Sequence, residues 1–159
     1  MMYTEIFRHK IVRPLGELLR QGLTPRRVAV TMALGIVIGL FPVPGSTTFL
    51  CTGAALLLHL NLPAIQLFNW LVFPLQLVLV FPFILMGNYL FGREPITLTA
   101  PQVTELFKTD FWHALHSLGE IIVHATLVWF LVAVPVFIIL YYMLTPLLKK
   151  MDFASIHRE

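Results

Sequence analysis

The sequence predicts an all-helical integral membrane protein, with a short broken helical hairpin, two longer transmembrane helices and amphipathic interfacial helices. Hydrophobic residues make up 58% of the chain and charged residues only 12%, with a mean hydropathy of +0.83. About a quarter of a typical soluble domain is charged. No charged residue occurs between Arg27 and Arg93. Polar and apolar residues do not alternate as they do in barrel strands, so helices are the expected spanning form.

Residues 1–22 form a basic segment in which Ile11, Leu15 and Leu18 recur near one helical face. This pattern is typical of a helix that lies on anionic headgroups. The segment has no long apolar stretch and no small-residue cleavage site, so it does not resemble a cleaved signal peptide. We expect it to be a positively charged anchor on the membrane surface.

The first arm of the hairpin is expected to begin with Thr24 as its N-cap and Pro25 as its first helical residue. Arg26 and Arg27 then fall in the first turn, where the helix dipole disfavours cations. An anionic group, such as a lipid phosphate, is expected to compensate them. The alternative is that both side chains simply extend to the membrane interface.

The two arms of the hairpin, residues 28–41 and 46–60, are each too short to cross a bilayer comfortably. They rise about 21 Å and 22 Å as helices, whereas the hydrocarbon core is about 30 Å thick. We therefore expect a re-entrant hairpin over residues 28–60. The alternative is a pair of spanning helices in a thin or distorted bilayer, with the break as an external loop.

The break between the arms combines residues that interrupt a helix with hydroxyl side chains. Prolines remove backbone donors, glycine tolerates a positive φ, and hydroxyls can cap the next helix. Non-helical backbone at membrane depth needs protein cover or a water-filled cavity. We predict a polar ligand-binding turn formed by Pro42, Pro44, Gly45, Ser46, Thr47 and Thr48.

Gly35 and Gly39 form a Gly-x-x-x-Gly pair inside the first arm. Small residues four positions apart let another helix approach closely. The second arm, residues 46–60, is the expected partner, although a homodimer contact would use the same surface.

Residues 63–91 form a long apolar segment that would rise about 43 Å if fully helical, so it must tilt, kink or extend beyond the core. Pro74 and Pro82 provide sites for kinks. Asn69 and Gln76 are amides that need partners in lipid, and we place both among the residues of the polar site.

Several short motifs in this region resemble those of one family. They are Thr24-Pro25-Arg26, the Gly-x-x-x-Gly pair, Pro42-x-Pro-Gly-x-Thr, Asn61-Leu-Pro, Trp70-x-x-x-Pro-Leu and Leu90-Phe-Gly92. Together they are similar to the domain-of-unknown-function 2062 family of small bacterial membrane proteins, over roughly residues 23–92. The resemblance implies a bacterial inner-membrane protein without an established activity, and some relatives occur beside or fused to glycosyltransferases. The family's Asn-Pro-Leu-Thr is replaced by Phe-Pro-Leu-Gln at residues 73–76, so a role of that asparagine does not carry over.

The charge distribution predicts the topology. Basic residues exceed acidic ones in residues 1–27 and in the tail, residues 149–159, whereas acidic residues exceed basic ones in residues 92–120. By the positive-inside rule, both termini are cytoplasmic. We therefore expect a membrane domain over residues 23–92, an external amphipathic segment over 93–120, a transmembrane helix over 121–148 and a short cytoplasmic tail. The net charge of +3 favours anionic lipid and requires no nucleic acid.

His113, His116, Glu120 and His124 fall within a stripe about 80° wide on a predicted helix. The stripe is interpreted first as a solvated face. A second interpretation is a proton relay or the lining of a polar cavity, since Glu120 and His124 enter an apolar segment where ionisable groups are costly. The third is a metal site at His116, Glu120 and His124, which would need further ligands from another helix or subunit.

The motifs of common catalytic sites are absent from the sequence, so an enzyme is not expected and no cofactor is implied. The single cysteine, Cys51, is expected to serve packing. Handling or transport of an anionic lipid or small solute through the hairpin accounts for the short helices and the basic turn together. The alternative is a structural or assembly protein that packs on a membrane partner such as a glycosyltransferase. We expect a homodimer, because four hydrophobic elements offer few walls for a closed pathway.

Overall fold

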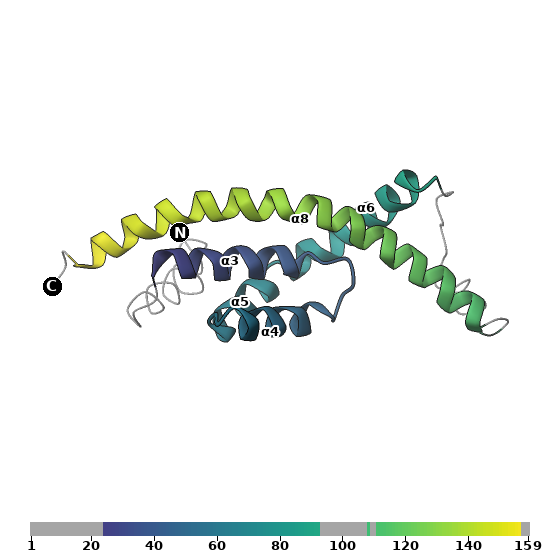
Figure 1. Ribbon diagram of the computed structural model, residues 1–159, viewed down its shortest axis with the longest axis horizontal. Coiled ribbons are helices and arrows are strands. Elements are labelled where there is room, and N and C mark those ends of the chain that lie inside the picture. Colours follow the sequence, from purple (N-terminus) through teal and green to yellow (C-terminus); the bar gives the residue numbers. More distant parts are fainter. Residues whose placement is uncertain (1–23, 93–107, 109–110, 157–159) are drawn as a thin grey trace, which may run out of the picture.

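The computed structural model describes residues 24–92, 108 and 111–156, and Figure 1 shows their arrangement. The side chains of residues 111, 113–115 and 151–156 lie outside this description. The described residues form helices and no strands, which confirms the all-helical fold class. The helices are α3 Pro25–Gly39, α4 Thr47–Leu57, α5 Leu62–Leu71, α6 Phe73–Leu90 and α8 Phe111–Ile156. The predicted N-terminal anchor and most of the predicted external segment lie outside the described residues.

Helix α3 begins where the sequence predicts. Thr24 has extended backbone angles, and its side-chain oxygen accepts a hydrogen bond from the backbone N–H of Arg27 at 3.4 Å. Pro25 occupies the first turn, where its missing N–H is not needed. The helix ends at Gly39, and the chain then turns through residues 40–46 into α4.

Helices α4 and α5 are joined by a tight turn around His59, which has a φ of 50°. Asn61 caps α5, because its Oδ1 accepts a hydrogen bond from the backbone N–H of Ala64 at 2.9 Å. Pro63 lies in the first turn of α5. The second arm of the hairpin is therefore a separate helix that ends before α5 returns in the direction of α3 (Figure 1).

The segment predicted as one kinked helix, residues 63–91, forms two helices. Helix α5 ends at Leu71 and α6 starts at Phe73, with Val72 as the junction. Pro74 lacks the N–H that would bond to the carbonyl of Trp70, and its ring clashes with that carbonyl in a straight helix. The second proline, Pro82, is accommodated inside α6.

Helix α8 is 46 residues long and would extend about 69 Å if straight. It contains Pro135 and Pro146. From Phe111 onward, the predicted external segment is continuous with the predicted transmembrane helix, and the helix continues past Lys150 to Ile156. The boundaries expected at residues 120 and 148 are therefore not breaks in secondary structure, because a change from apolar to polar side chains does not interrupt backbone hydrogen bonding.

Helix α3 is the centre of the packed part of the molecule and contacts α4, α5 and α8. Gly35 and Gly39 do pack against another helix, but their close neighbours are in α5 and not in the second arm. A Cβ at Gly35 would lie 2.6 Å from the Ile65 carbonyl oxygen, and one at Gly39 would lie 3.1 Å from the Asn69 Cα. The turn at residues 58–61 allows α5, the next helix along the chain, to occupy the face of α3 that was expected to pack on α4.

Two of the described helices are long and apolar enough to cross a membrane, Phe73–Leu90 and the part of α8 from His116 to Lys150. Only 11% of the residues in the most apolar stretch of α8 are buried. Large apolar side chains are instead exposed, including Phe49, Leu57 and Leu131. Apolar surface of this extent is typical of contact with lipid or with another protein. The coarse expectation of an all-helical protein with membrane-compatible helices is thus supported.

Candidate functional site

The break between α3 and α4 is held by side chains from two other helices. The Gln76 side chain donates from Nε2 to the carbonyl oxygen of Phe41 at 2.7 Å. The indole N–H of Trp129 donates to the carbonyl oxygen of Val37 at 3.2 Å, and its ring meets Phe41 edge-on with centroids 5.0 Å apart. Carbonyl groups in the last turn of a helix have no partner within the helix. Helix α6 therefore satisfies the Phe41 carbonyl in the break, and α8 adds a donor to the Val37 carbonyl, which also accepts from the Leu40 N–H at 3.2 Å.

Gln76 is almost fully buried, with 1% of its surface exposed. Its Oε1 has no hydrogen-bond partner. The expectation that this amide needs a polar partner agrees with its bond to Phe41, and one acceptor is left unused beside the break. An unpaired buried acceptor is unusual in proteins and commonly marks a place that water or a ligand reaches.

The turn itself has the conformation expected from its residues. Gly45 has a φ of 89°, which favours glycine. The side chain of Ser46 donates to the carbonyl oxygen of Val43 at 2.8 Å and does not cap α4. Pro42 is buried, whereas Pro44 and Gly45 are exposed. The hydroxyl predicted as a helix cap thus stabilises the turn, and no side chain caps the start of α4.

A chain of polar side chains joins α4 to α5 next to the break. Gln66 donates from Nε2 to the Thr48 carbonyl at 2.9 Å and to the Thr52 hydroxyl oxygen at 3.0 Å. Asn69 donates from Nδ2 to Gln66 Oε1 at 3.1 Å. Asn69 is buried, and Thr52 also bonds to the Thr48 carbonyl at 2.8 Å. The predicted residues Thr48 and Asn69 therefore belong to one polar network.

A pocket of about 60 Å³ lies where the break between α3 and α4 meets the junction of α5 and α6. It is lined by Gly45, Thr47, Thr48, Asn69, Trp70 and Phe73. Gly39 also packs against Val72, the junction residue. Most of its lining is apolar, with polar groups supplied by Thr47, Thr48 and Asn69. A cavity of this size has room for a few water molecules. The structure thus brings three of the six residues predicted for the polar turn, Gly45, Thr47 and Thr48, together with Asn69 at this pocket. Gln76 bonds to the Phe41 carbonyl in the same break.

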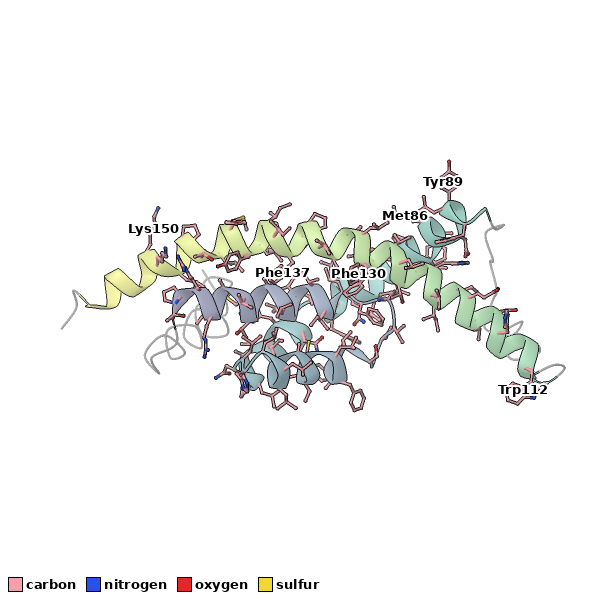
Figure 2. The ribbon with its side chains drawn as sticks, in the orientation of Figure 1. Met86, Tyr89, Trp112, Phe130, Phe137 and Lys150 are labelled. Atoms are coloured by element: carbon pink, nitrogen blue, oxygen red, sulfur yellow. The ribbon has the colours of Figure 1, made fainter. Side chains whose placement is uncertain are left out.

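Arg26 and Arg27 do not belong to this pocket. Both are exposed in the first turn of α3, at the opposite end of that helix. Their neighbour Val28 lies in one buried cluster with Leu148 of α8, which is followed by Lys149 and Lys150. Figure 2 shows Lys150 on the stretch of α8 that passes the start of α3, with its side chain directed away from α3. The predicted headgroup residues therefore form a separate basic end of the molecule.

Only two side chains of the predicted polar stripe on α8 lie close to each other. His116 Nδ1 and Glu120 Oε1 are 3.7 Å apart. The His124 ring stacks on Phe91, with centroids 4.1 Å apart, and its Nδ1 is buried without a hydrogen-bond partner. The side chain of His113 lies outside the described residues. Among the described side chains, no three His, Cys, Asp or Glu residues are placed to hold a metal ion.

Three residues of the site region were not predicted. Gln66 could have been found, because it is a polar residue in an apolar helix and lies three positions before Asn69, on the same face. Asn88 carries a similar signal. It is buried where α6 crosses α8, and neither of its amide atoms has a hydrogen-bond partner. Trp129 carries no such signal, since its carbonyl partner is set by tertiary packing.

The fold and the site define a helical protein with two membrane-compatible helices and a small pocket between interrupted helices, beside a network of polar side chains. The chain belongs to the family described as "Uncharacterized protein conserved in bacteria (DUF2062)", whose model matches residues 7–155. This confirms the family that the motifs predict and extends it over nearly the whole chain. No curated protein and no solved structure matches the chain.

Proposed function

We propose that this chain is an integral protein of the bacterial inner membrane, and that it handles or transports an anionic lipid or a small solute through a re-entrant α3–α4 hairpin. The observation that carries the proposal is the meeting of two helix interruptions at one pocket. Gly45 and Thr48 come from the first interruption, and Phe73 comes from the second. Interrupted helices that meet around polar groups near the bilayer midplane are a common construction of transport sites.

The depth of the break supports re-entry. From Arg27 to Leu40, α3 rises about 20 Å, which is two-thirds of a hydrocarbon core of about 30 Å. Helix α8 runs alongside α3, and its Val132 lies beside Leu40. From Val132 toward its N-terminus, α8 remains largely apolar for about another 16 Å. If the basic end lies at the cytoplasmic surface, the break lies inside the membrane and both arms return to the same side.

The alternative role, a structural or assembly protein that packs on a membrane partner through the glycine face of α3, has less support. It required the Gly35 and Gly39 face to be open to a partner helix, whereas α5 occupies this face. A partner such as a glycosyltransferase would have to use one of the exposed apolar faces instead. Those faces are equally suited to lipid.

The proposal is tested by measuring the accessibility of cysteines introduced into a Cys51→Ala protein. Thr48→Cys places a thiol in the pocket lining, and Phe49→Cys, one residue further, is the matched control because its side chain is 79% exposed and outside the pocket lining. Lys150→Cys marks the basic end. Membrane-impermeant thiol reagents are added from either side of sealed vesicles.

We expect Thr48→Cys to react from the same side as Lys150→Cys, and Phe49→Cys to remain unlabelled because it faces lipid. Labelling of Thr48→Cys from the opposite side would make the hairpin a spanning pair. No labelling of Thr48→Cys from either side would mean a dry pocket. Each of these two results contradicts the proposal.

A further inference from the structure

Helix α4 starts without a side-chain cap, beside the pocket between the interrupted helices. Its first bonded N–H is that of Leu50, which donates to the Ser46 carbonyl at 3.0 Å. Within the described part of the chain, the N–H groups of Thr47, Thr48 and Phe49 have no hydrogen-bond partner. In a soluble protein, water would satisfy such groups. At the membrane depth that we propose for the break, they need a partner inside the pocket.

Two buried side chains at the same place also have unused hydrogen-bonding groups. Thr47 is 4% exposed, and its hydroxyl forms no hydrogen bond with the described residues. Asn69, also 4% exposed, donates from Nδ2 to Gln66 Oε1, which leaves its second Nδ2 hydrogen available. Both residues line the pocket, together with Gly45, which precedes the start of α4. Free donors from a helix end, a hydroxyl and an amide therefore meet at one cavity.

These donors favour a ligand with a single negative charge. The N–H groups at a helix start and the positive end of the helix dipole attract anionic oxygens. None of the residues that line the pocket is charged, and the sequence has no charged residue between Arg27 and Arg93. The dipole is equivalent to only about half a positive charge, and removing an ion from water is costly. A second negative charge would therefore be left uncompensated.

The pocket lies at the apolar surface of the molecule. Trp70 and Phe73 line it, although they are 64% and 39% exposed, and their ring centroids are 6.4 Å apart. Phe49, in the first turn of α4, is 79% exposed. In the membrane-inserted protein these aromatic side chains face lipid. A ligand that reaches the donors past Trp70 and Phe73 can therefore keep its apolar chains in the bilayer.

We propose that the start of α4 binds the phosphodiester group of a singly charged phospholipid, which enters the pocket sideways from the bilayer. The N–H groups of the first turn and the Thr47 hydroxyl donate to the anionic oxygens, and the Asn69 amide adds a further donor. The acyl chains lie along Trp70 and Phe73. This inference rests on the membrane insertion of the break in the proposed function, and it names the lipid class and the group that is bound.

The test uses the full chain in phosphatidylcholine vesicles that contain a trace of phosphatidylglycerol, phosphatidic acid or phosphatidylcholine with a spin label on the acyl chain. Electron spin resonance gives the fraction of label that the protein immobilises, and hence relative association constants. Thr47→Val removes the hydroxyl with little change of shape, and Thr47→Asp places a carboxylate of the protein itself at the helix start. Thr31→Val is the matched control, because Thr31 is equally buried, at 3% exposed, and lies on α3 outside the pocket lining.

We expect the unsubstituted protein to prefer phosphatidylglycerol to phosphatidylcholine, and also to phosphatidic acid at a mildly alkaline pH, where phosphatidic acid carries two charges. Thr47→Val should weaken the association of phosphatidylglycerol by roughly tenfold, the effect of losing one hydrogen bond to a charged group. Thr47→Asp should remove the preference, because like charges then meet at the helix start. Thr31→Val should leave the preference unchanged.

Three results would overturn the inference. An unchanged preference in both Thr47 variants would mean that the start of α4 does not bind the lipid. Tighter binding of doubly charged phosphatidic acid than of phosphatidylglycerol would mean that a cation lies at the site. Displacement of labelled phosphatidylglycerol by inorganic phosphate at similar concentration would identify the soluble ion as the ligand.

Failure of the lipid site is distinguishable from failure of the re-entrant hairpin. If Thr48→Cys reacts from the side opposite Lys150→Cys while the Thr47 variants lose the lipid preference, the lipid site stands and the re-entrant hairpin is wrong. If Thr48→Cys reacts as proposed but the three lipids are immobilised equally, the lipid site alone is wrong.

Discussion

At the scale of single residues, Gln76 links the end of α3 to α6 through its 2.7 Å hydrogen bond to the Phe41 carbonyl. We predict that Gln76→Leu lowers the stability of the protein in detergent by about 1–3 kcal/mol, because it leaves a carbonyl beside the break unpaired. Thermal unfolding followed by size-exclusion chromatography measures the change. Leu77→Ala is the control, since Leu77 is 54% exposed. Equal midpoints for Gln76→Leu and the unsubstituted protein would contradict this role.

Gly35 and Gly53 allow a matched comparison of two glycines in helices. A Cβ at Gly35 would meet the Ile65 carbonyl oxygen at 2.6 Å, a backbone atom that cannot move aside without displacing α5. At Gly53, nothing lies within 4 Å. We predict that Gly35→Ala destabilises the protein by roughly 1–3 kcal/mol, whereas Gly53→Ala is neutral or stabilising by up to about 1 kcal/mol. Thermal unfolding of both variants tests this, and similar effects at the two positions would contradict the close contact of α3 with α5.

At the scale of elements, the sequence was most informative where a local interaction sets the structure. The start of α3 followed from Thr24 and Pro25, and the turn at Gly45, which has a positive φ, followed from the glycine between prolines and hydroxyl residues. The junction at Val72 was not predicted, although Pro74 signals a kink. Whether a proline bends a helix or ends it depends on neighbouring helices, and here the Gly39 contact holds Val72 in place.

The partner of the Gly-x-x-x-Gly face shows the same limit. Small residues indicate that some helix comes close, but the choice of α5 over α4 depends on the direction in which the chain leaves the turn at His59. In the candidate site, Thr48, Asn69 and Gln76 could be predicted as polar groups in an apolar segment. The pairing of Asn69 with Gln66, three positions earlier on the same face, was also open to prediction. The bonds from Gln66 to α4 and from Gln76 to a carbonyl of the break were not, because they depend on how the helices pack.

The attachment of α4 to α5 depends on Gln66, which bonds to both the Thr48 carbonyl and the Thr52 hydroxyl. We predict that Gln66→Leu increases amide hydrogen exchange in the first turns of α4 by about fivefold or more, because both bonds are lost. Exchange in α8 should not change and serves as the internal control. Unchanged protection of α4 would show that apolar packing around Cys51 and Ile65 is sufficient to hold it.

At the scale of the whole molecule, the two polar regions lie at different heights along α8. The basic end lies beside Leu148, and the pocket between interrupted helices lies on the far side of α3, near the level of Val132. A lipid that binds at the basic end would therefore have its headgroup on the membrane surface, about 20 Å from the pocket. For the proposed transport, the headgroup has to leave the cations and move along the α3–α4 hairpin to the polar network.

This separation leads to a prediction about transport itself. Vesicles that contain the protein should move a fluorescent anionic phospholipid between leaflets faster than empty vesicles, as measured by quenching of the outer leaflet with dithionite. Asn69→Leu removes a buried polar group of the pocket and should slow this movement at least several-fold without changing the amount of folded protein in the vesicles. Phe49→Leu, on the exposed face of α4, should have no effect. If the protein gives the rate of empty vesicles, the pocket does not carry lipid. If Asn69→Leu retains the full rate, lipid does not pass through this pocket.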